Sequence, residues 1–487
     1  HPKAVIFKKM SKIPAEQIEQ MIINPPDWVK AITYEEMLTL QDGLPVYAKH
    51  PRFPILRWYL CLQLIAIVFF PFLFPLTRNL ADGGWSFART LGILFLCYTA
   101  WLLSSLHVLP FNSISLWLIL SGFLLAAIFL YRRYWHEMRN LLSQRVWILI
   151  IQELFWLGTL ALFLVIRMNN PAILWGEKPM DMSFIASAYR TDYFPPLDPW
   201  FAGRIVNYYY YGHVVISSLG ILTGLPAHYL FNLALATIPA LVALGAFGII
   251  YNITRKWTYG VLGAYLMTLA GHLFGYLQMA ENLNSSGKGG LSAVINGFLP
   301  TIRLAWQTFV NLLSGDAALL TEYHRLVGFD SYFWKCSRVI PNTVANEFPI
   351  WTFLFADLHA HMIVMPFTIL LIGLGYALFT GQGKALHPRT GYKGGWWATF
   401  LICLTLGTVF CINAWDFPTS LLLILCILIL KWYRFQNPDE QQYLPRAIQG
   451  LAIQSPLLSR ITAPVYSFLA EVLLPLILVA ALSVLFF

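Results

Sequence analysis

The chain has 487 residues, of which 58% are hydrophobic, 16% aromatic and only 11% charged. A soluble globular domain carries roughly 25% charged residues because it needs them to cover its surface. This composition excludes a soluble enzyme, a nucleic-acid-binding protein and a secreted disulfide scaffold, and it predicts a protein that lies mainly in lipid. The formal net charge of +9 is typical of membrane proteins with cytoplasmic loops rich in Lys and Arg.

We identify about ten apolar runs that approach or exceed the ~20 residues a helix needs to cross a bilayer. They are rich in Leu, Ile, Phe and Gly and lack the alternating pattern of barrel strands. We therefore expect an all-α, polytopic transmembrane protein. The runs lie at 58–76, 88–106, 112–131, 147–166, 230–251, 259–279, 362–380, 396–413, 417–432 and 463–487.

Basic residues between these runs predict the orientation, because cytoplasmic loops carry the excess of Lys and Arg. Every basic cluster can face the cytoplasm if the segment 213–225 does not cross the bilayer. That segment covers roughly 20 Å as a helix, short of the ~30 Å hydrocarbon core, so we expect it to be re-entrant or interfacial. The clusters are Arg78 with Arg89; Arg132, Arg133, Arg139 and Arg145; Arg255 with Lys256; Lys384, Arg389 and Lys393; and Lys431, Arg434, Arg446 and Arg460.

This orientation places two long loops, 167–212 and 280–361, on the outer face, together with the short turn 413–418. We expect the segment 1–57 to be a small peripheral part on that face, followed by a membrane domain over 58–487. Because the chain begins with His and ends inside an apolar run, we also expect it to be a piece of a longer product that continues upstream.

The first group of polar residues lies in the loop 167–212. Carboxylates are interspersed there with aromatic residues, and the prolines and glycines predict an ordered, non-helical loop. Tyrosine rings suit the headgroup level, so an aromatic belt is one interpretation. A belt does not explain the carboxylates, and we favour a functional surface. Its candidate residues are Asp181, Asp198, Asn207, Tyr208, Tyr209, Tyr210, Tyr211 and His213.

The second polar group precedes the run 362–380 and contains Glu347 and the pattern Asp357-x-His359-x-His361. Imidazole and carboxylate are common metal ligands. In an extended segment all three side chains of the pattern would share a face, whereas in a helix only the first and last would. The surrounding run looks helical, so we expect these residues to bind an anionic headgroup or a sugar rather than a divalent metal.

Two further carboxylates lie within or beside apolar runs. Asp416, between the runs 396–413 and 417–432, is open to two interpretations: a helix cap before Pro418, or a functional group at the membrane surface. Glu153 lies inside the run 147–166 and needs either a partner or a protonated state, because an isolated charge in a bilayer is costly.

Several short motifs resemble, in order and spacing, the YYY-type polytopic membrane-domain family of bacteria and archaea. The motifs are EKPMD at 177–181, YFPPLDPWFAG at 193–203, NYYYYGH at 207–213, NEFP at 346–349, DLHAH at 357–361 and NAWDFP at 413–418. The resemblance covers roughly residues 58–487. It implies an integral protein of a prokaryotic cell membrane, whereas the family is itself uncharacterised.

A more distant similarity, to integral-membrane glycosyltransferases of the GT-C class, concerns the chemistry. In that class an acidic residue opens an outer loop, which continues through an aromatic-Pro segment to a Tyr-rich stretch and a short helix. Asp181, 192–203 and 207–224 fall in that order here. The similarity implies transfer of a sugar from a polyprenyl-phosphate carrier, with Asp181 at the position proposed to bind or deprotonate the acceptor. Many members carry an acidic pair there, whereas Asp181 lies between Met180 and Met182.

Glycosyl transfer needs a carboxylate that takes the acceptor proton and groups that stabilise the departing phosphate. We expect Asp181 to be the base, Asp198 and Asn207 to orient the sugar, and the four tyrosines to stack on it. The expected phosphate ligands are His359, His361 and Arg338.

The sequence thus predicts a GT-C-like membrane glycosyltransferase that acts at the outer membrane face, with membrane lipid and a polyprenyl-phosphate-linked sugar as its partners and no required cofactor. The alternative is a non-catalytic membrane subunit or scaffold that assembles with other membrane subunits. A secondary transporter fits less well, because such proteins have related halves with interrupted helices and the sequence shows no internal repeat.

Overall fold

Eight helices of the described residues are long and apolar enough to cross a membrane. The computed structural model describes residues 51–168, 171–276, 333–338, 346–381, 395–434 and 468–487, apart from positions 175, 202, 274 and 334. The predicted all-α polytopic fold is confirmed. The long helices are α3 (Pro54–Thr77), α4 (Trp85–Ser105), α5 (Ser113–Arg133), α6 (Trp135–Met168), α9 (Ala227–Thr254), α14 (Ala360–Thr380), α15 (Gly395–Ile412) and α16 (Asp416–Arg434).

One of the predicted spans is shorter in the structure. The run expected at 259–279 forms α10 (Trp257–Thr268), and just beyond its end Ile350 N donates to Ala270 O at 3.2 Å. The last run contributes the π-helix η6 (Leu469–Leu473) and α19 (Leu474–Leu485) to the described residues. The expectations for the segment 1–50 lie outside the described residues.

The centre of the bundle is α9, most of whose residues are buried. It packs along α6, α10, α14 and α4. Close approach depends on small residues, as is common between membrane helices: a Cβ on Gly248 would lie 2.0 Å from Ser86 Oγ of α4. By contrast, fewer than a third of the residues in the apolar stretches of α5, α6 and α16 are buried, as expected of helices that face lipid.

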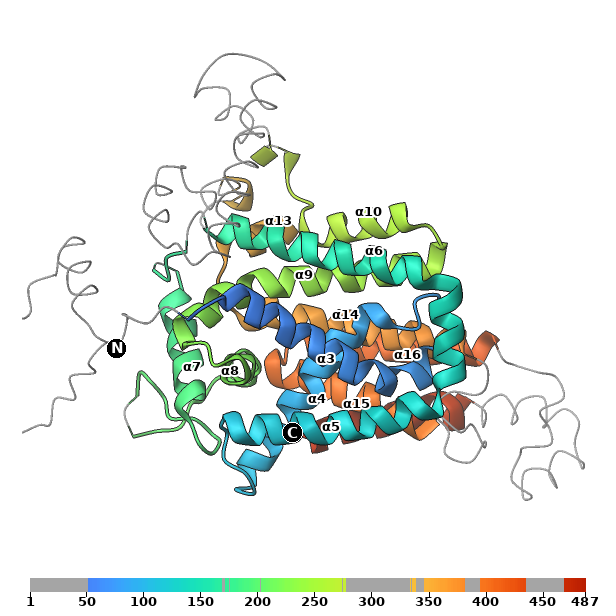
Figure 1. Cartoon of the computed structure of the whole chain (residues 1–487), viewed down its shortest axis with the longest axis horizontal. Coiled ribbons are helices and arrows are strands. Elements are labelled where there is room, and N and C mark those ends of the chain that lie inside the picture. The colour runs from blue at the N-terminus through green and yellow to red at the C-terminus, as the bar shows by residue number, and fades with distance from the viewer. Residues whose placement is uncertain are drawn as a thin grey trace, which may run out of the picture. The chain divides into compact units, whose positions relative to one another are not determined.

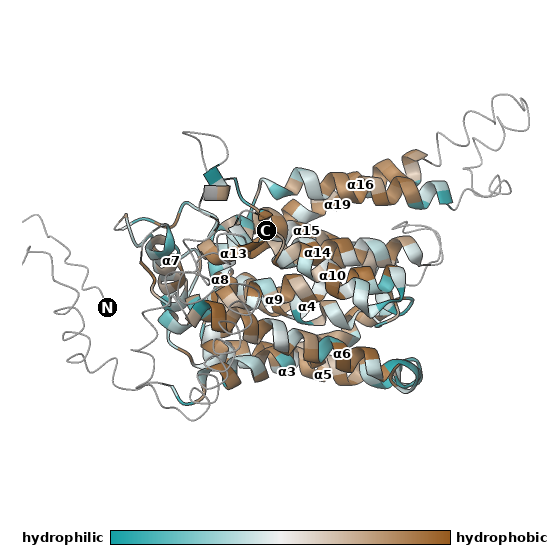
Figure 2. Cartoon of the chain, turned by 90° about the horizontal axis from the view of Figure 1, so that it is seen from above, coloured by the Kyte–Doolittle hydropathy of each residue, from teal (hydrophilic) through white to brown (hydrophobic). Residues whose placement is uncertain are grey.

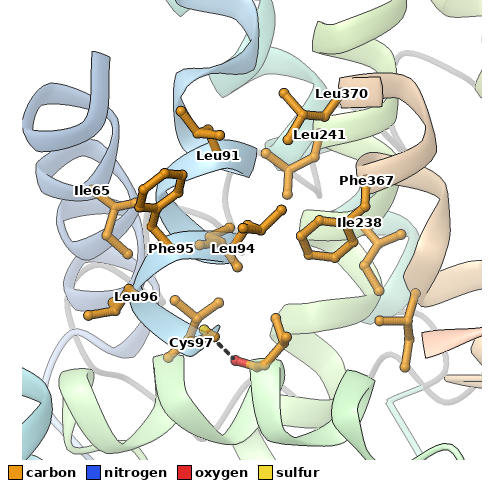
Figure 3. Close-up of a cluster of buried hydrophobic side chains, with 14 of the residues drawn as sticks. Ile65, Leu91, Leu94, Phe95, Leu96, Cys97, Ile238, Leu241, Phe367 and Leu370 are labelled. Carbon is orange, nitrogen blue, oxygen red and sulfur yellow. Dashed lines mark hydrogen bonds between the residues drawn. The ribbon is translucent and has the colours of Figure 1, made fainter. Parts of the chain in front are cut away.

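Side chains from helices that are distant in sequence form one buried apolar core (Figure 3). Ile65 of α3, Leu94 of α4, Ile238 of α9 and Phe367 of α14 all contribute to it. In Figure 2 hydrophobic residues run along the long helices, and hydrophilic residues gather near the helix ends. This distribution is expected where lipid rather than water surrounds the middle of a bundle.

Two shorter helices, α7 (Lys178–Arg190) and α8 (Tyr211–Thr223), lie at one end of the long helices and run across them (Figure 1). We call this the α7 end, and the other end of the long helices the opposite end. The short α8 agrees with the prediction that 213–225 does not span the bilayer: it has 13 residues, and all of them are buried.

The expectation of a non-helical loop around Asp181 was wrong, because these residues form α7. Pro179 occupies the first turn, where its missing N–H costs nothing, and Arg190 lies in the last turn, where a cation complements the helix dipole. The helix-breaking prolines lie beyond α7. There Asp198 N donates to Arg204 O at 2.7 Å and closes a compact loop.

Glu153 of α6 has the partner that its position requires. Arg89 Nη2 of α4 lies 2.7 Å from Glu153 Oε1, and Gln63 and Trp85 also donate to the carboxylate, at 2.6 and 2.5 Å. The ring of Trp156 covers the guanidinium at 4.9 Å. Arg89 was expected to flank a cytoplasmic loop, but its side chain is fully buried and links α4 to α6.

Candidate functional site

Asp181 and His213 meet where α7 packs against α8. Asp181 lies in the first turn of α7 and His213 in the first turn of α8, and both are buried, with 0% and 1% of their surface exposed. Ser217 Oγ of α8 donates to Ile185 O of α7 at 3.0 Å, which fixes the two helices together. The helix contact therefore sets the distance between the carboxylate and the imidazole.

Among the described residues, the Asp181–His213 pair has no hydrogen-bond partner. His213 Nε2 lies 3.5 Å from Asp181 Oδ1, yet neither carboxylate oxygen and neither ring nitrogen makes a hydrogen bond. Buried polar groups are nearly always hydrogen-bonded, and an exception calls for an explanation such as a catalytic role. A deeply buried carboxylate without donors is a strong acceptor for any hydroxyl that reaches it.

Aromatic rings cover this pair. Phe184 meets His213 edge-on, with 5.4 Å between ring centroids, and Tyr208 stacks on Phe184 at 5.4 Å. Burial, followed by the negative charges of Asp181 and Glu177, raises the pKa of Tyr208 above its ordinary value. At neutral pH Tyr208 therefore keeps its phenolic proton and remains a hydrogen-bond donor beside the carboxylate.

A second buried pair joins the start of α7 to the chain before α14. Lys178 Nζ lies 2.8 Å from Asp357 Oδ1, and both side chains are almost completely buried. The backbone N–H of Glu177 donates to Asp357 Oδ2 at 3.2 Å. Gly176 lies directly against this carboxylate with a φ of +65°, and a Cβ there would come within 2.9 Å of Asp357 Oδ2. Only glycine suits that position.

The expectation of a continuous helix through Asp357, His359 and His361 was wrong. The helix α13 (Pro349–Phe355) ends at Ala356 with a φ of 60°, and α14 begins at Ala360 after an extended His359. At the break, Asp357 pairs with Lys178 of α7.

Each residue of this pattern has a different partner. His359 Nε2 lies 2.7 Å from Glu177 Oε2, and His361 Nε2 lies 3.0 Å from Glu347 Oε2. In the described part of the chain, no group of three or more His, Cys, Asp or Glu side chains could hold a metal ion. His359 Nε2 also lies 3.9 Å from Asp357 Oδ2, so Glu177, His359, Asp357 and Lys178 form one connected group, and His361 pairs with Glu347 beside it.

Glu347 and His361 link the start of α14 to the other polar groups of the site. Its carboxylate accepts hydrogen bonds from His361 and, at 2.8 Å, from Thr352 Oγ1. The hydrogen bond from His361 holds the pKa of Glu347 below its ordinary value, against the opposing effect of burial. His361 also lies within electrostatic reach of Asp181 and Asp416. The structure therefore gathers the three polar groups of the sequence at one end of the bundle.

The four tyrosines do not form a single stacking surface. Tyr208 is exposed, and Tyr209 and Tyr210 are half-buried. Tyr210 stacks on Phe194, and Tyr211 is buried against Trp101 and Phe487. One stretch of sequence thus contributes both an exposed side chain at the rim of the site and a buried side chain in the core.

Three other candidates have local roles or exposed positions. Asp198 Oδ1 accepts from the backbone N–H groups of Trp200 and Phe201, at 2.8 and 3.0 Å, and stabilises its own loop. Asn207 is exposed. Asp416 lies in the first turn of α16, where Asn413 Nδ2 donates to Asp416 Oδ2 at 3.1 Å.

Lys178 is the residue that sequence reasoning left without a role. It precedes Asp181 by three positions, so on a helix the two side chains share a face. That spacing would have been informative if α7 had been predicted.

Arg338, an expected phosphate ligand, lies in the short η4 (Lys335–Arg338). In the same short helix Ser337 O accepts a hydrogen bond from Asn346 N at 2.7 Å.

The fold and this site define a polytopic α-helical membrane protein with buried acid–base pairs at one end of its bundle. The chain belongs to the family described as uncharacterized membrane protein (DUF2298), whose family model matches residues 95–487. No curated protein and no solved structure matches the chain. The family agrees with the expected uncharacterised polytopic membrane proteins, and any activity has to be inferred from the site.

Proposed function

We propose that this protein is a membrane glycosyltransferase that moves a sugar from a polyprenyl-phosphate carrier to an acceptor at the outer membrane face. The observation that carries the proposal is Asp181, a fully buried carboxylate whose two oxygens accept no hydrogen bond. The resemblance of 181–224 to the first outer loop of GT-C enzymes supports it, as does the position of the site at one end of the membrane helices.

In this reaction Asp181 takes the proton of an acceptor hydroxyl. The hydroxyl oxygen forms a bond to the anomeric carbon, and the bond from that carbon to the phosphate oxygen breaks, so that its electron pair leaves with the phosphate. His213, 3.5 Å from Asp181, stabilises the carboxylate before transfer and holds the base in place. General-base catalysis of this kind contributes typically 10²–10⁴-fold.

The departing phosphate needs positive charge or hydrogen-bond donors. Lys178 lies three residues before Asp181 on α7, and His361 lies in the first turn of α14; each is paired with a carboxylate that holds it in position. Tyr208 adds a phenolic donor at the rim. Because Phe184 and Tyr208 cover Asp181, substrate entry requires these rings to move aside.

The complete burial of Asp181 and His213 also favours the alternative of a non-catalytic subunit or scaffold. In that case the acid–base pairs at the α7 end hold α7, α8 and α14 together, and no substrate reaches the carboxylate. The two functions differ in one measurable property, the consumption of a lipid-linked sugar.

The test uses the full chain in proteoliposomes supplied with a panel of polyprenyl-phosphate-linked sugars and a lipid extract as acceptor. Mass spectrometry follows the loss of each donor. We expect turnover of one donor by the wild-type chain, no turnover by Asp181→Asn, and normal turnover by Asp192→Asn, which removes an exposed carboxylate of the same loop. Full activity of Asp181→Asn would remove this residue from the mechanism, and no turnover of any donor by the wild type would favour the scaffold.

A further inference from the structure

A segment at the opposite end of the bundle carries charges that sugar transfer does not use. The helix α5 ends at Arg133, and after Tyr134 the chain enters the first part of α6, which ends at a non-helical Arg145 with a φ of −139°. In Figure 1 this part of α6 joins the right-hand ends of α5 and α6 and runs across the long helices. We call Trp135–Gln144 the crossing segment.

The inner side of the crossing segment is fixed to the bundle. Met138 is buried among Phe70 and Phe74 of α3, and Leu141 packs against the same cluster. Glu137 lies 3.6 Å from Arg78 at the end of α3. The segment is thus a packed part of the fold with a defined outer side, and that side determines what it can bind.

The outer side of the crossing segment and its flanks is basic and aromatic. Arg132, Arg133 and Arg139 are exposed, and Glu137 is the one acidic residue between positions 131 and 146 of the sequence. Trp135, at the start of the segment, and Trp147, just after it, expose 51% and 46% of their surfaces. Arginines and exposed indoles at the end of spanning helices are typical of protein segments at the membrane–water interface.

We propose that the crossing segment binds the headgroups of anionic phospholipids. A guanidinium group presents paired N–H donors that match the oxygens of a phosphate, and clustered Arg or Lys next to a spanning helix attracts anionic lipid. The spanning helices α5 and α6 hold the three arginines near headgroup level, where the phosphates of lipids are concentrated. The exposed Leu142 and Val146 suit the adjacent acyl chains, so the ligand is a membrane lipid rather than free phosphate.

This inference is independent of the proposed sugar transfer, because its test needs no sugar. The full chain is placed in nanodiscs of phosphatidylcholine alone and in nanodiscs of equal parts phosphatidylcholine and phosphatidylglycerol. Thermal unfolding is recorded in both, and native mass spectrometry counts retained phosphatidylglycerol. The variants are Arg132→Gln/Arg133→Gln/Arg139→Gln and a matched control, Arg57→Gln/Arg190→Gln/Arg204→Gln, which removes three exposed arginines from the α7 end.

We expect phosphatidylglycerol to raise the midpoint of unfolding of the wild-type chain. The crossing-segment variant should lose at least half of that rise and most of the retained phosphatidylglycerol, whereas the control should keep both. The same rise and retention in the crossing-segment variant, an equal loss in the control, or no rise in the wild type would each overturn the proposal. If the crossing segment instead bound an acidic protein or a nucleic acid, phosphatidylglycerol would not raise the midpoint of unfolding of the wild type.

Discussion

Asp181 of α7 and His213 of α8 lie 3.5 Å apart, and both are buried at one end of a membrane-helix bundle. Neither side chain makes a hydrogen bond within the described part of the chain. Two groups that can ionise are rarely enclosed in this way unless each serves the other. The contact rests on the packing of α7 against α8, which adjacent positions in the sequence do not reveal. It is the structural basis of the proposed catalytic base.

His213→Gln removes the imidazole and keeps much of the side-chain volume. If His213 positions the base, kcat for sugar transfer should fall about 10²-fold, while KM for the lipid-linked donor stays unchanged. The matched control is Ser217→Ala, which deletes the hydrogen bond from α8 to α7 without touching the pair. Equal losses in the two variants would mean that His213 only holds the helices together.

The buried pair of Lys178 and Asp357 should dominate the stability of the α7 end. Asp357→Ala leaves the ammonium group buried without its carboxylate, and breaking such a pair costs about 3–5 kcal/mol of the free energy of unfolding. The double variant Lys178→Met/Asp357→Leu removes both charges and should recover most of that loss. Unfolding in mixed detergent micelles measures both values, and a single variant as stable as the wild type would show that the pair is not a stabilising contact.

A comparable pair lies within the membrane region. Glu153→Ala leaves the fully buried Arg89 guanidinium without its carboxylate. We expect a cost of about 3 kcal/mol, at the low end for buried pairs because part of Glu153 is exposed. Glu153→Gln keeps oxygen and volume and should cost less. The same unfolding measurement compares the two, and equal stability of the alanine variant and the wild type would contradict the assignment.

The contact between Glu347 and His361 predicts how the stability of the protein depends on pH. The hydrogen bond from His361 lowers the pKa of Glu347 in the folded protein, so the stabilisation is complete above the ordinary glutamate pKa, about 4.3. It is lost as the pH falls through the lower, folded pKa. The same hydrogen bond raises the pKa of His361, so the gap in unfolding midpoint between the wild type and Glu347→Gln should grow as the pH falls from 7 toward the ordinary histidine pKa, about 6.5, and then level off. The gap should shrink below about pH 4.3, and a gap that keeps growing there would contradict the assigned contact.

Hydropathy was sufficient to locate most of the bundle. The run 112–131 became α5 (Ser113–Arg133), and 362–380 became α14 (Ala360–Thr380), because a spanning helix leaves a long apolar signal that depends on no distant residue. Helices shorter than a span leave no such signal. For this reason α7 was mistaken for a loop: its prolines and glycines lie at its start and beyond its end.

The partners within the site could not be predicted in the same way. Lys178 and Asp357 are 179 positions apart, and nothing in either local sequence specifies the other. Tyr208 and Tyr211 lie within one run of tyrosines, yet one lines the rim and the other lies in the core. Periodicity indicates that polar residues gather near one membrane face, whereas their pairing depends on how α7, α8 and α14 pack.

The most direct test of the account is a cryo-electron microscopy map of Asp181→Asn in nanodiscs with the donor that the wild-type chain consumes. The variant lacks the base and should trap the uncleaved donor. We predict sugar density beside position 181 and phosphate density within hydrogen-bonding reach of Lys178 or His361, with the polyprenyl chain running into the bilayer. Donor density elsewhere, or an α7 end that remains closed over position 181 at saturating donor, would contradict the proposed glycosyltransferase.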